Sequence, residues 1–213
     1  MIKDKLGHKL DQWIHVAFPF LFKWRINPNA LTVIGAGISA VAALAFGRGE
    51  FLAAGLLLAV GGFCDLVDGV VARHFGSSSA FGGFLDSTLD RLVDMVVLLA
   101  LAIYYAGAGD PMTAVVAGIG LVSSVLTSYT KARAEAMGVD LPGGIIERGE
   151  RIGLLMAGGI FDVMVPALWV LAVGATATVV QRFTSALRSM DAKPLEPLET
   201  DIDAAAEPLA HVE

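Results

Sequence analysis

Long apolar runs separated by short polar segments are the feature that most restricts how this chain can fold. Hydrophobic residues make up 55% of the 213 residues and charged residues only 17%, against about 25% charged in typical soluble domains. A helix that crosses a bilayer needs about 20 mainly apolar residues. We therefore predict an all-α integral membrane protein with a single membrane domain over residues 1–188.

Six apolar runs predict six transmembrane helices. The break at Asn27-Pro28-Asn29 precedes the first, and Asn29 can cap a helix that starts at Ala30. Several runs reach the length of a crossing only if the helix continues into its polar flank. The expected spans cover residues 30–46, 51 to the charged stretch at 65, 82–106, 111–137, 152–164 and 166–183.

The two ends of the chain differ from the spans. Residues 1–26 carry apolar side chains at helical spacing, together with Trp13, Trp24 and several lysines, which predicts an amphipathic helix in the membrane interface. A soluble partner-binding helix would show the same pattern, but the position just before a span favours the interface. Residues 189–213 are rich in proline and acidic residues, which predicts a disordered tail.

Lysine and arginine alternate between the segments that connect the spans. They gather in the N-terminal segment, in the loop between the fourth and fifth spans and at the C-terminal end, and they are sparse in the other loops. Because basic residues collect on the cytoplasmic side, both termini and the charged stretch at residues 65–90 are expected to face the cytoplasm. The protein is then a multi-pass component of the cell (inner) membrane.

Four aspartates lie within the apolar sequence at helical spacing. Asp65 and Asp68 stand at i and i+3, and Asp86 and Asp90 at i and i+4, so each pair shares one face of a helix. Carboxylates at membrane depth are costly and repel one another, which calls for a compensating cation. Oxygen ligands favour a hard ion such as Mg²⁺, Mn²⁺ or Ca²⁺. The aspartates thus predict a metal site.

Two other interpretations also put acids in spanning segments. One is a salt-bridge cluster neutralised by Arg73 and Arg91, and the other is the ion path of a transporter. Neither needs the glycines at 69 and 82, which stand beside the acids and leave room for a bulky ligand next to the backbone. Glycines are also common in ordinary helix packing, so the two glycines alone would not indicate a ligand site. Their positions beside the aspartates favour one.

The stretch from Asp65 to Asp90 reads D-x2-D-G-x2-A-R-x8-G-x3-D-x3-D and resembles the signature of the CDP-alcohol phosphotransferases at all eight fixed positions. The resemblance implies a bundle of six membrane helices, usually a homodimer, that acts in phospholipid biosynthesis as a transferase. It also implies an active site with two metal ions, Mg²⁺ or Mn²⁺, that binds the CDP-linked lipid at the cytoplasmic boundary.

The resemblance also implies roles for individual residues. The metal ligands would be Asp65, Asp68, Asp86 and Asp90. The CDP-diacylglycerol site would be formed by Asp68, Gly69, Ala72, Arg73 and Gly82, with the arginine near the diphosphate. Two cations would polarise the phosphorus and stabilise the CMP leaving group.

Asp90 is the candidate catalytic base that takes the proton of the acceptor hydroxyl, a role that the family gives to its last aspartate. A purely metal-ligating Asp90 is the alternative. Asp94, one further turn along, either supports the site or pairs with a neighbour such as Arg91.

The acceptor alcohol has to be inferred elsewhere, because family members use serine, choline, glycerol phosphate, inositol or inositol phosphate. Ser128 and Lys131 share a helical face, as do Arg148 and Arg151, so a hydroxyl and several cations could surround a phosphate group. An ordinary cytoplasmic flank explains the same residues equally well. Its local ion pairs would join Lys131 to Glu135 and Glu147 to Arg151.

The sequence motifs SYxKARAE and GGxIERxER resemble those of actinobacterial phosphatidylinositol-phosphate synthases, whose acceptor is myo-inositol 1-phosphate. Arg182, after Gln181, resembles an acceptor-site arginine of that group. The implied reaction transfers the phosphatidyl group of CDP-diacylglycerol to inositol phosphate. The implied ligands of the acceptor phosphate are Ser128, Lys131, Arg133, Arg148, Arg151 and Arg182.

Two other functions stay open. A phosphatidylglycerophosphate synthase, which uses glycerol 3-phosphate, also needs a phosphate pocket. A metal-ion transporter needs a polar path to the opposite side of the membrane, yet the outer halves of the spans and the outer loops offer few charged residues. These are Arg48, Glu50, Asp110 and Asp162.

Overall fold

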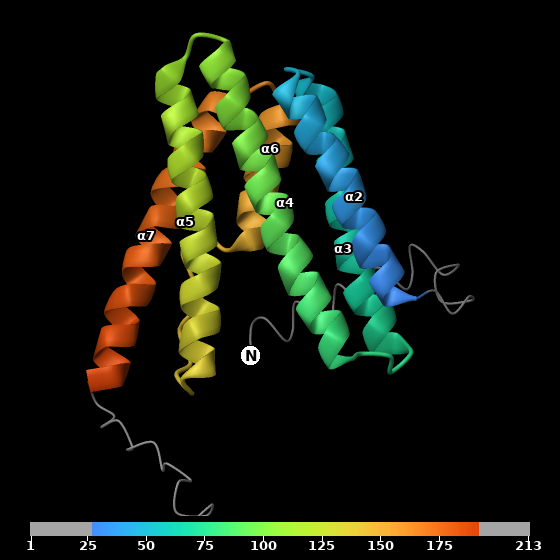
Figure 1. The fold of residues 1–213 in the computed structure, drawn as a ribbon, viewed down its shortest axis with the longest axis vertical. Helices are drawn as coiled ribbons and strands as arrows, with labels where there is room; N and C mark the ends of the chain where they lie inside the picture. The colour runs from blue at the N-terminus through green and yellow to red at the C-terminus, as the bar shows by residue number, and fades with distance from the viewer. Residues whose placement is uncertain (1–26, 192–213) are drawn as a thin grey trace, which may run out of the picture.

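The computed structural model describes residues 27–191, which form six α-helices and no strand (Figure 1). This arrangement confirms the all-α membrane fold expected from the sequence. The interfacial helix predicted at residues 1–26 lies outside the described residues. The disordered tail was predicted from residue 189, but residues 189–191 belong to the last helix, and the rest of the predicted tail lies outside the described residues. The helices are α2 (Pro28–Gly47), α3 (Phe51–His74), α4 (Ala80–Gly107), α5 (Pro111–Ala136), α6 (Arg148–Ile160) and α7 (Met164–Asp191).

The start of α2 differs from the expected one. The helix begins at Pro28, and the side chain of Asn27, rather than that of Asn29, caps it by accepting a hydrogen bond from the Asn29 amide at 3.0 Å. Proline is favoured at the first position of a helix because its fixed φ suits the helix and its missing N–H would have no partner there. Asn29 is thereby free to turn its side chain toward α4.

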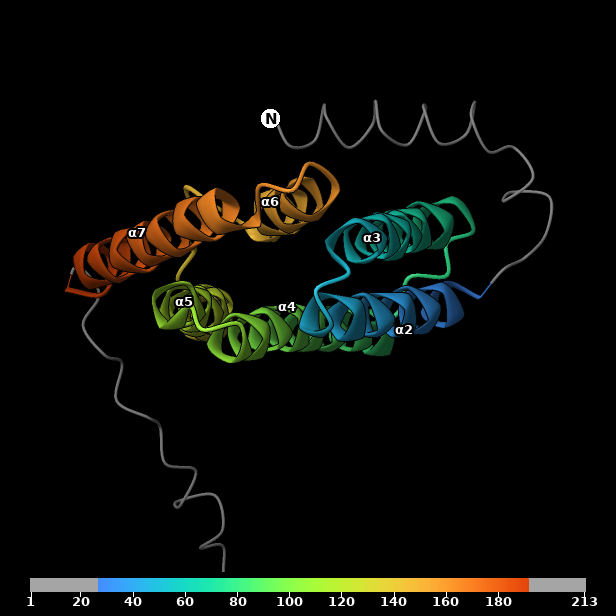
Figure 2. The same ribbon diagram turned by 90° about the horizontal axis from the view of Figure 1, so that it is seen from above.

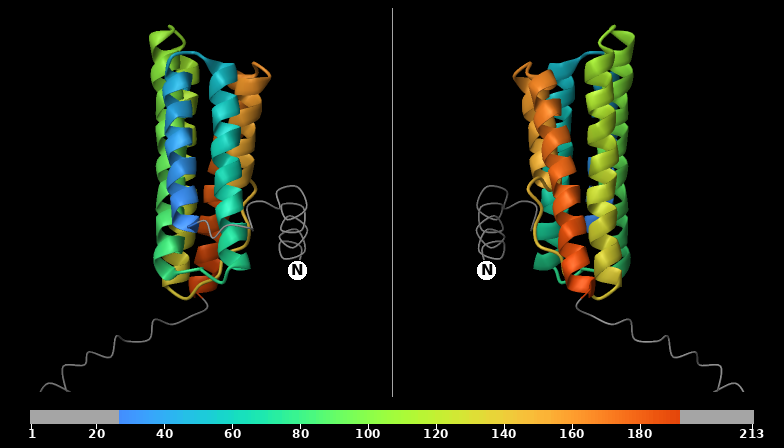
Figure 3. Two further views of the ribbon diagram at one scale, coloured as in Figure 1. Left: turned by 90° about the vertical axis from the view of Figure 1, so that its right-hand side faces the viewer. Right: turned by 90° about the vertical axis from the view of Figure 1, so that its left-hand side faces the viewer.

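The six helices form two layers of three. Figure 2 shows α2, α4 and α5 in one layer and α3, α6 and α7 in the other. Contacts of α2 with α3 and of α5 with α7 join the layers at both ends, and Figure 3 shows the two layers edge-on. The core between them contains fully buried large side chains, among them Phe46, Leu58, Leu101 and Leu168.

Four helices, not the expected six, are by themselves long and apolar enough to cross a membrane: α2, α3, α5 and α7. Helix α4 has 28 residues and is about 42 Å long, but it carries four charged residues within its first 15. Helix α6 has only 13 residues, or about 20 Å, while the hydrocarbon core is about 30 Å thick. Its polar start, at Arg148, was expected to precede the fifth span.

Helix α6 packs closely on α3 through glycine. A Cβ atom on Gly159 would lie 2.6 Å from the carbonyl oxygen of Phe51, and one on Gly55 would lie 2.9 Å from the amide nitrogen of Ile160. Such distances leave no room for any side chain, so the two backbones can approach only where both residues are glycine. This crossing holds the end of α6 against the beginning of α3.

The segment between α5 and α6 is attached to α7. The buried hydroxyl of Thr178 accepts a hydrogen bond from the Ile146 amide at 3.0 Å, and the amide of Gln181 donates to the Gly143 carbonyl at 3.2 Å. The side chain of Ile146 fills the space that a Cβ on Gly174 would need. Figure 1 shows the result: α6 begins well inside the bundle and occupies its upper part.

Candidate active site

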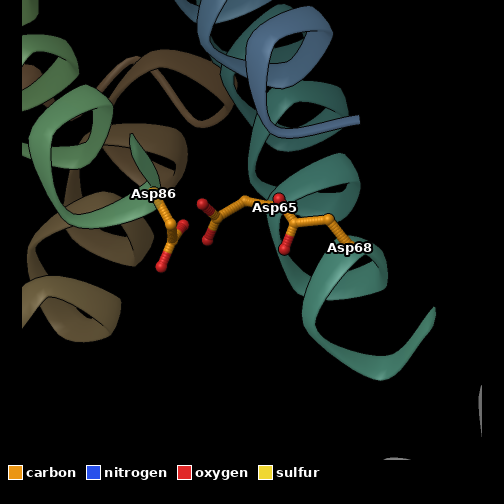
Figure 4. A group of neighbouring side chains, drawn as sticks. All are labelled: Asp65, Asp68 and Asp86. Carbon is orange, nitrogen blue, oxygen red and sulfur yellow. The ribbon is translucent and has the colours of Figure 1, made fainter. Parts of the chain in front are cut away.

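Three of the four signature aspartates form one cluster. Asp65 and Asp68 come from α3 and Asp86 from α4, and one carboxylate oxygen of each lies within 4.8 Å of the others. Figure 4 shows the three carboxylates facing the space between the two helices. A cluster of oxygen donors alone is the donor set that hard divalent cations prefer. The residues therefore fit a divalent metal ion.

Asp68 is held by a residue of a third helix. The hydroxyl of Thr32, on α2, lies 2.5 Å from Oδ2 of Asp68, and both side chains are buried. A hydrogen bond to a metal-ligating carboxylate fixes the orientation of that carboxylate. The sequence interpretation missed Thr32. The signal was its position three residues after Asn29, on the same helical face and at the same end of the bundle.

Asp90, the fourth aspartate, lies one turn beyond Asp86 and forms an ion pair with Arg148. The Nη2 atom of Arg148 is 2.6 Å from Oδ1 of Asp90, and the Nη1 atom is 2.7 Å from Oδ2 of Asp65. The guanidinium therefore bridges the carboxylates of two helices. Sequence analysis paired these aspartates with a metal and placed Arg148 in the acceptor site, so this bridge was not foreseen.

A pocket of about 190 Å³ opens beside Asp68 and Asp86, between α2, α3 and α4. A Cβ atom on Gly82 would lie 3.0 Å from the side-chain oxygen of Asn29, so this glycine makes room for an α2 side chain at the pocket wall. Asn29 was interpreted from the sequence only as a helix cap. The pocket brings together every residue predicted for CDP-diacylglycerol: Asp68, Gly69, Ala72, Arg73 and Gly82. We call it the α2–α4 pocket.

A second pocket of about 380 Å³ lies on the other side of Asp90 and is lined by α4, α5, α6 and α7. We call it the basic pocket. Arg133 does not line it and is exposed, because two residues along α5 turn its side chain about 200° away from Lys131. Five of the six residues predicted for the acceptor phosphate line the pocket: Ser128, Lys131, Arg148, Arg151 and Arg182.

The ion pairs in the basic pocket differ from those expected. Asp94 does not pair with Arg91, but accepts from Nε of Arg151 at 3.1 Å and from its Nη2 at 2.5 Å. Both side chains are buried, with relative exposures of 4% and 2%. Lys131 and Glu135 form the expected surface pair at 3.9 Å. Burial makes the Asp94 pair a fixed part of the pocket wall.

Glu147 also has an unexpected partner. Its carboxylate lies 3.5 Å from Nη2 of Arg182, on α7, instead of pairing one turn along α6 with Arg151. The Nη1 atom of Arg182 donates to the carbonyl of Thr127, on α5. Because α5, α6 and α7 meet at this arginine, the guanidinium is held in place from two sides and its position is set by packing rather than by local spacing.

A third pocket, of about 360 Å³, was not foreseen from the sequence. It extends from Asp65, Asp90 and Arg148 into the apolar interior between α2, α3, α4 and α6, where Leu58 and Met156 line it. We call it the apolar pocket. The small residues around it, including Gly35, Gly62 and Gly153, were a signal, but glycine alone does not tell packing from a cavity.

Comparisons with known proteins find one family and one fold. The model of the CDP-alcohol phosphatidyltransferase family matches residues 25–181. A phosphatidylinositol phosphate synthase of Streptomyces avermitilis is 38% identical over 203 residues, covering 88% of this chain and 80% of its own length.

Two solved structures of the Mycobacterium tuberculosis phosphatidylinositol phosphate synthase have the same fold. The one in complex with manganese and citrate has a TM-score of 0.73 and 33% identity, and covers 79% of this chain and 86% of its own. The one with CDP-DAG bound has a TM-score of 0.71 and 30% identity, and covers 85% and 94%. With its signature aspartates clustered at the junction of three pockets and the family match spanning most of its helices, the chain belongs to the CDP-alcohol phosphatidyltransferase family.

Proposed function

We propose that this protein transfers the phosphatidyl group of CDP-diacylglycerol to myo-inositol 1-phosphate and releases CMP. The observation that carries the proposal is the position of the acid cluster. Asp65, Asp68, Asp86 and Asp90 stand where the α2–α4 pocket, the basic pocket and the apolar pocket meet. A reaction between a nucleotide-activated lipid and a polar anionic acceptor needs one reacting centre with access for all three chemical parts.

The chemistry of each pocket fits one part of the reaction. The α2–α4 pocket contains the signature residues implied in nucleotide binding, and Arg73, one of its lining residues, is implied near the diphosphate. The basic pocket presents cations to a phosphate, and Arg151 still has its Nη1 atom without a partner among the described residues. The similar S. avermitilis and M. tuberculosis proteins are named for the product phosphatidylinositol phosphate. An inositol phosphate acceptor would give this product and suits a pocket of this size and charge.

The reaction balances with Asp90 as the base. The acceptor hydroxyl oxygen bonds to the lipid-side phosphorus while the bond from that phosphorus to the bridging oxygen breaks, and CMP leaves with this oxygen. The hydroxyl proton passes to the carboxylate of Asp90. Divalent ions held by the four aspartates would neutralise the diphosphate and the leaving group, and we propose two such ions, Mg²⁺ or Mn²⁺.

We further propose the membrane setting expected from the sequence. Both termini and the acid cluster face the cytoplasm, because the basic residues gather at that end. The membrane domain covers residues 1–188, and the protein acts as a homodimer. The family resemblance and the many apolar side chains on the outer helix faces, such as Leu44, Leu99 and Val173, support these assignments.

The test is CMP release by the purified protein in detergent with Mg²⁺ or Mn²⁺ and CDP-diacylglycerol. Inositol 1-phosphate, inositol, glycerol 3-phosphate and serine are supplied in turn. We expect turnover with inositol 1-phosphate at least about tenfold above that with inositol or serine, since a cationic pocket discriminates strongly against acceptors that leave it unpaired. Glycerol 3-phosphate also carries a phosphate, so its turnover relative to inositol 1-phosphate tests the proposed alcohol.

Asp90→Asn is expected to abolish this turnover, while the exposed Asp140→Asn, outside the cluster, should leave it unchanged. If no acceptor released CMP, the proposed reaction would be wrong. Faster turnover with glycerol 3-phosphate would overturn the proposed acceptor alone.

A further inference from the structure

Arg148 occupies a position that conflicts with the site's own chemistry. It bridges Asp65 and Asp90 with both terminal nitrogens, at 2.7 and 2.6 Å, so a metal ligand and the proposed base are both neutralised by an arginine. The remaining nitrogen, Nε, is buried and has no hydrogen-bond partner. A buried donor without a partner is unfavourable, so this position does not satisfy the guanidinium completely.

The bridge is incompatible with a fully assembled metal site. The guanidinium contacts both oxygens of Asp65 and Oδ1 of Asp90, so a divalent ion that bound Asp65 and Asp90 would have to share these carboxylates with it. Two cations sharing the same oxygens would also repel at close range in a poorly solvated site. The cluster that is ready for a cation accordingly contains Asp65, Asp68 and Asp86 without Asp90. Arg148 and a bound metal therefore compete.

The guanidinium of Arg148 can also reach the basic pocket. Arg148 lines the basic pocket as well as the apolar pocket, and its long side chain extends from the first residue of α6. In the basic pocket it would meet Lys131, Arg151 and Arg182. Each of those cations is already paired with a carboxylate, so a further guanidinium finds no free acid on them when the pocket holds no anion. When the pocket is filled, they share a phosphate with it.

We propose that Arg148 is a counterion that a divalent metal displaces. Without metal it holds Asp65 and Asp90 together across α3 and α4, and with metal it moves into the basic pocket and becomes a ligand of the acceptor's phosphate. The second half rests on the proposed function. Metal and anionic acceptor then support each other's binding, and the acceptor pocket is completed only after the metal is in place.

This coupling is reciprocal by thermodynamic necessity. Metal increases the affinity for phosphate by some factor, and phosphate increases the affinity for metal by the same factor. The coupling depends on one side chain that contacts both sites, so it disappears when that side chain is shortened and loses its charge.

The first experiment measures Mn²⁺ binding by electron paramagnetic resonance, without substrates, in the wild type and in Arg148→Gln. We expect the variant to bind Mn²⁺ about tenfold more tightly, because the competing cation is gone. Arg91→Gln is the matched control. It removes the same charge from α4, but its guanidinium donates to the Ser87 carbonyl and forms no ion pair with the four aspartates among the described residues. Because its charge acts on Asp86 only without direct contact, its effect should stay below about threefold.

The second experiment measures the affinity for inorganic phosphate by calorimetry, with EDTA or with saturating Mn²⁺. In the wild type we expect phosphate to bind about tenfold more tightly with Mn²⁺, and in Arg148→Gln equally under both conditions. Arg148→Lys retains the positive charge but lacks the planar guanidinium that bridges two carboxylates. Its gain in phosphate affinity on adding Mn²⁺ should therefore lie between that of the wild type and that of Arg148→Gln. Thermal unfolding of each variant verifies that it is folded.

Two results would overturn the proposal. One is equal tightening of Mn²⁺ binding in Arg148→Gln and Arg91→Gln, which would indicate general electrostatics. The other is metal-dependent phosphate binding that persists in Arg148→Gln, which would mean that phosphate contacts the metal directly. Both experiments use Mn²⁺ and inorganic phosphate alone, so their failure is distinguishable from failure of inositol phosphate as the acceptor in the turnover assay.

Discussion

The hydroxyl of Thr32 is the link between α2 and the acid cluster. It lies 2.5 Å from Oδ2 of Asp68, whose side chain is nearly inaccessible to solvent. A carboxylate buried this deeply needs partners for its oxygens. Thr32 supplies one of them at Oδ2, so the other oxygen of Asp68 could hold an ion.

We predict that Thr32→Val weakens metal binding by about 10- to 100-fold, the usual effect of losing a hydrogen bond to a metal-ligating side chain. Valine has nearly the same shape and removes only the hydroxyl. Mn²⁺ titration measures the affinity, and CMP release should fall in parallel. Thr32→Ser, which restores the hydroxyl, is the control, and a valine variant that binds Mn²⁺ like the serine variant would contradict this role.

At the residue scale, the sequence was sufficient for the acids but not for their partners. The spacing of Asp65, Asp68, Asp86 and Asp90 predicts which of them share a helix face, because that depends only on the helical repeat. Arg148, in contrast, is 83 residues from Asp65, and Arg151 is 57 residues from Asp94. Pairs so far apart depend on how helices pack, which local spacing does not encode.

Helix α6 carries its charges against the usual preference. Arg148 and Arg151 stand in its first turn, where the positive end of the helix dipole disfavours cations. Glu150, in the same turn, accepts a hydrogen bond from the Glu147 amide at 3.0 Å and offsets part of the charge. Carboxylates of α3 and α4 offset the rest, so this helix start is stable only when docked against its neighbours.

The glycine crossing between α3 and α6 makes a prediction for stability. Gly159→Ala forces a Cβ atom against the Phe51 carbonyl, and overpacking of this kind costs about 1–3 kcal/mol. For a chain of this size the unfolding temperature should fall by roughly 5 °C. Thermal unfolding in detergent measures it.

The matched control is Gly153→Ala in the same helix, where a Cβ atom meets nothing within 4 Å. It should leave the unfolding temperature unchanged or raise it slightly, because alanine favours a helix over glycine. Equal unfolding temperatures for the two variants would show that the crossing tolerates a methyl group and that the backbones can separate.

Helix positions followed from hydropathy with small errors at the ends. The runs at residues 82–106 and 111–137 correspond to α4 and α5 within two residues. The fifth and sixth runs were misplaced, since α6 starts at Arg148 and α7 continues to Asp191. Their polar ends are buried against other helices or extend beyond the apolar run, so hydropathy alone does not mark them. The glycines could be read from the sequence, but which helix each one packs against could not be predicted from it.

The whole molecule places one charged centre between two helix layers. Contacts of α2 with α4 and of α3 with α6 close the bundle around it, and the pockets enter from different sides. The layers have few other charged groups in their interior, so binding of a cation at the cluster affects the stability of the entire bundle rather than that of one loop.

We predict that Mn²⁺ stabilises the bundle and that EDTA removes the effect. At about 100 times its dissociation constant, a metal that binds only the folded state adds about 2.7 kcal/mol, which corresponds to roughly 5–10 °C for a chain of this length. Thermal unfolding with Mn²⁺ or EDTA measures the difference. Asp86→Asn should eliminate most of the increase, whereas Asp140→Asn, exposed in the α5–α6 segment, should retain it. An unchanged increase in Asp86→Asn would place the ion elsewhere.

The short length of α6 and the charges of α4 have a consequence for biogenesis. The other four helices are apolar enough to enter the bilayer individually as they leave the ribosome. Helix α6 is too short to cross alone, and the acids of α4 oppose its transfer into lipid. We therefore expect these two helices to enter together with their partners, after α2 and α3 are available to receive them. Membrane insertion of the polypeptide and assembly of its aspartate site would then be one cooperative event.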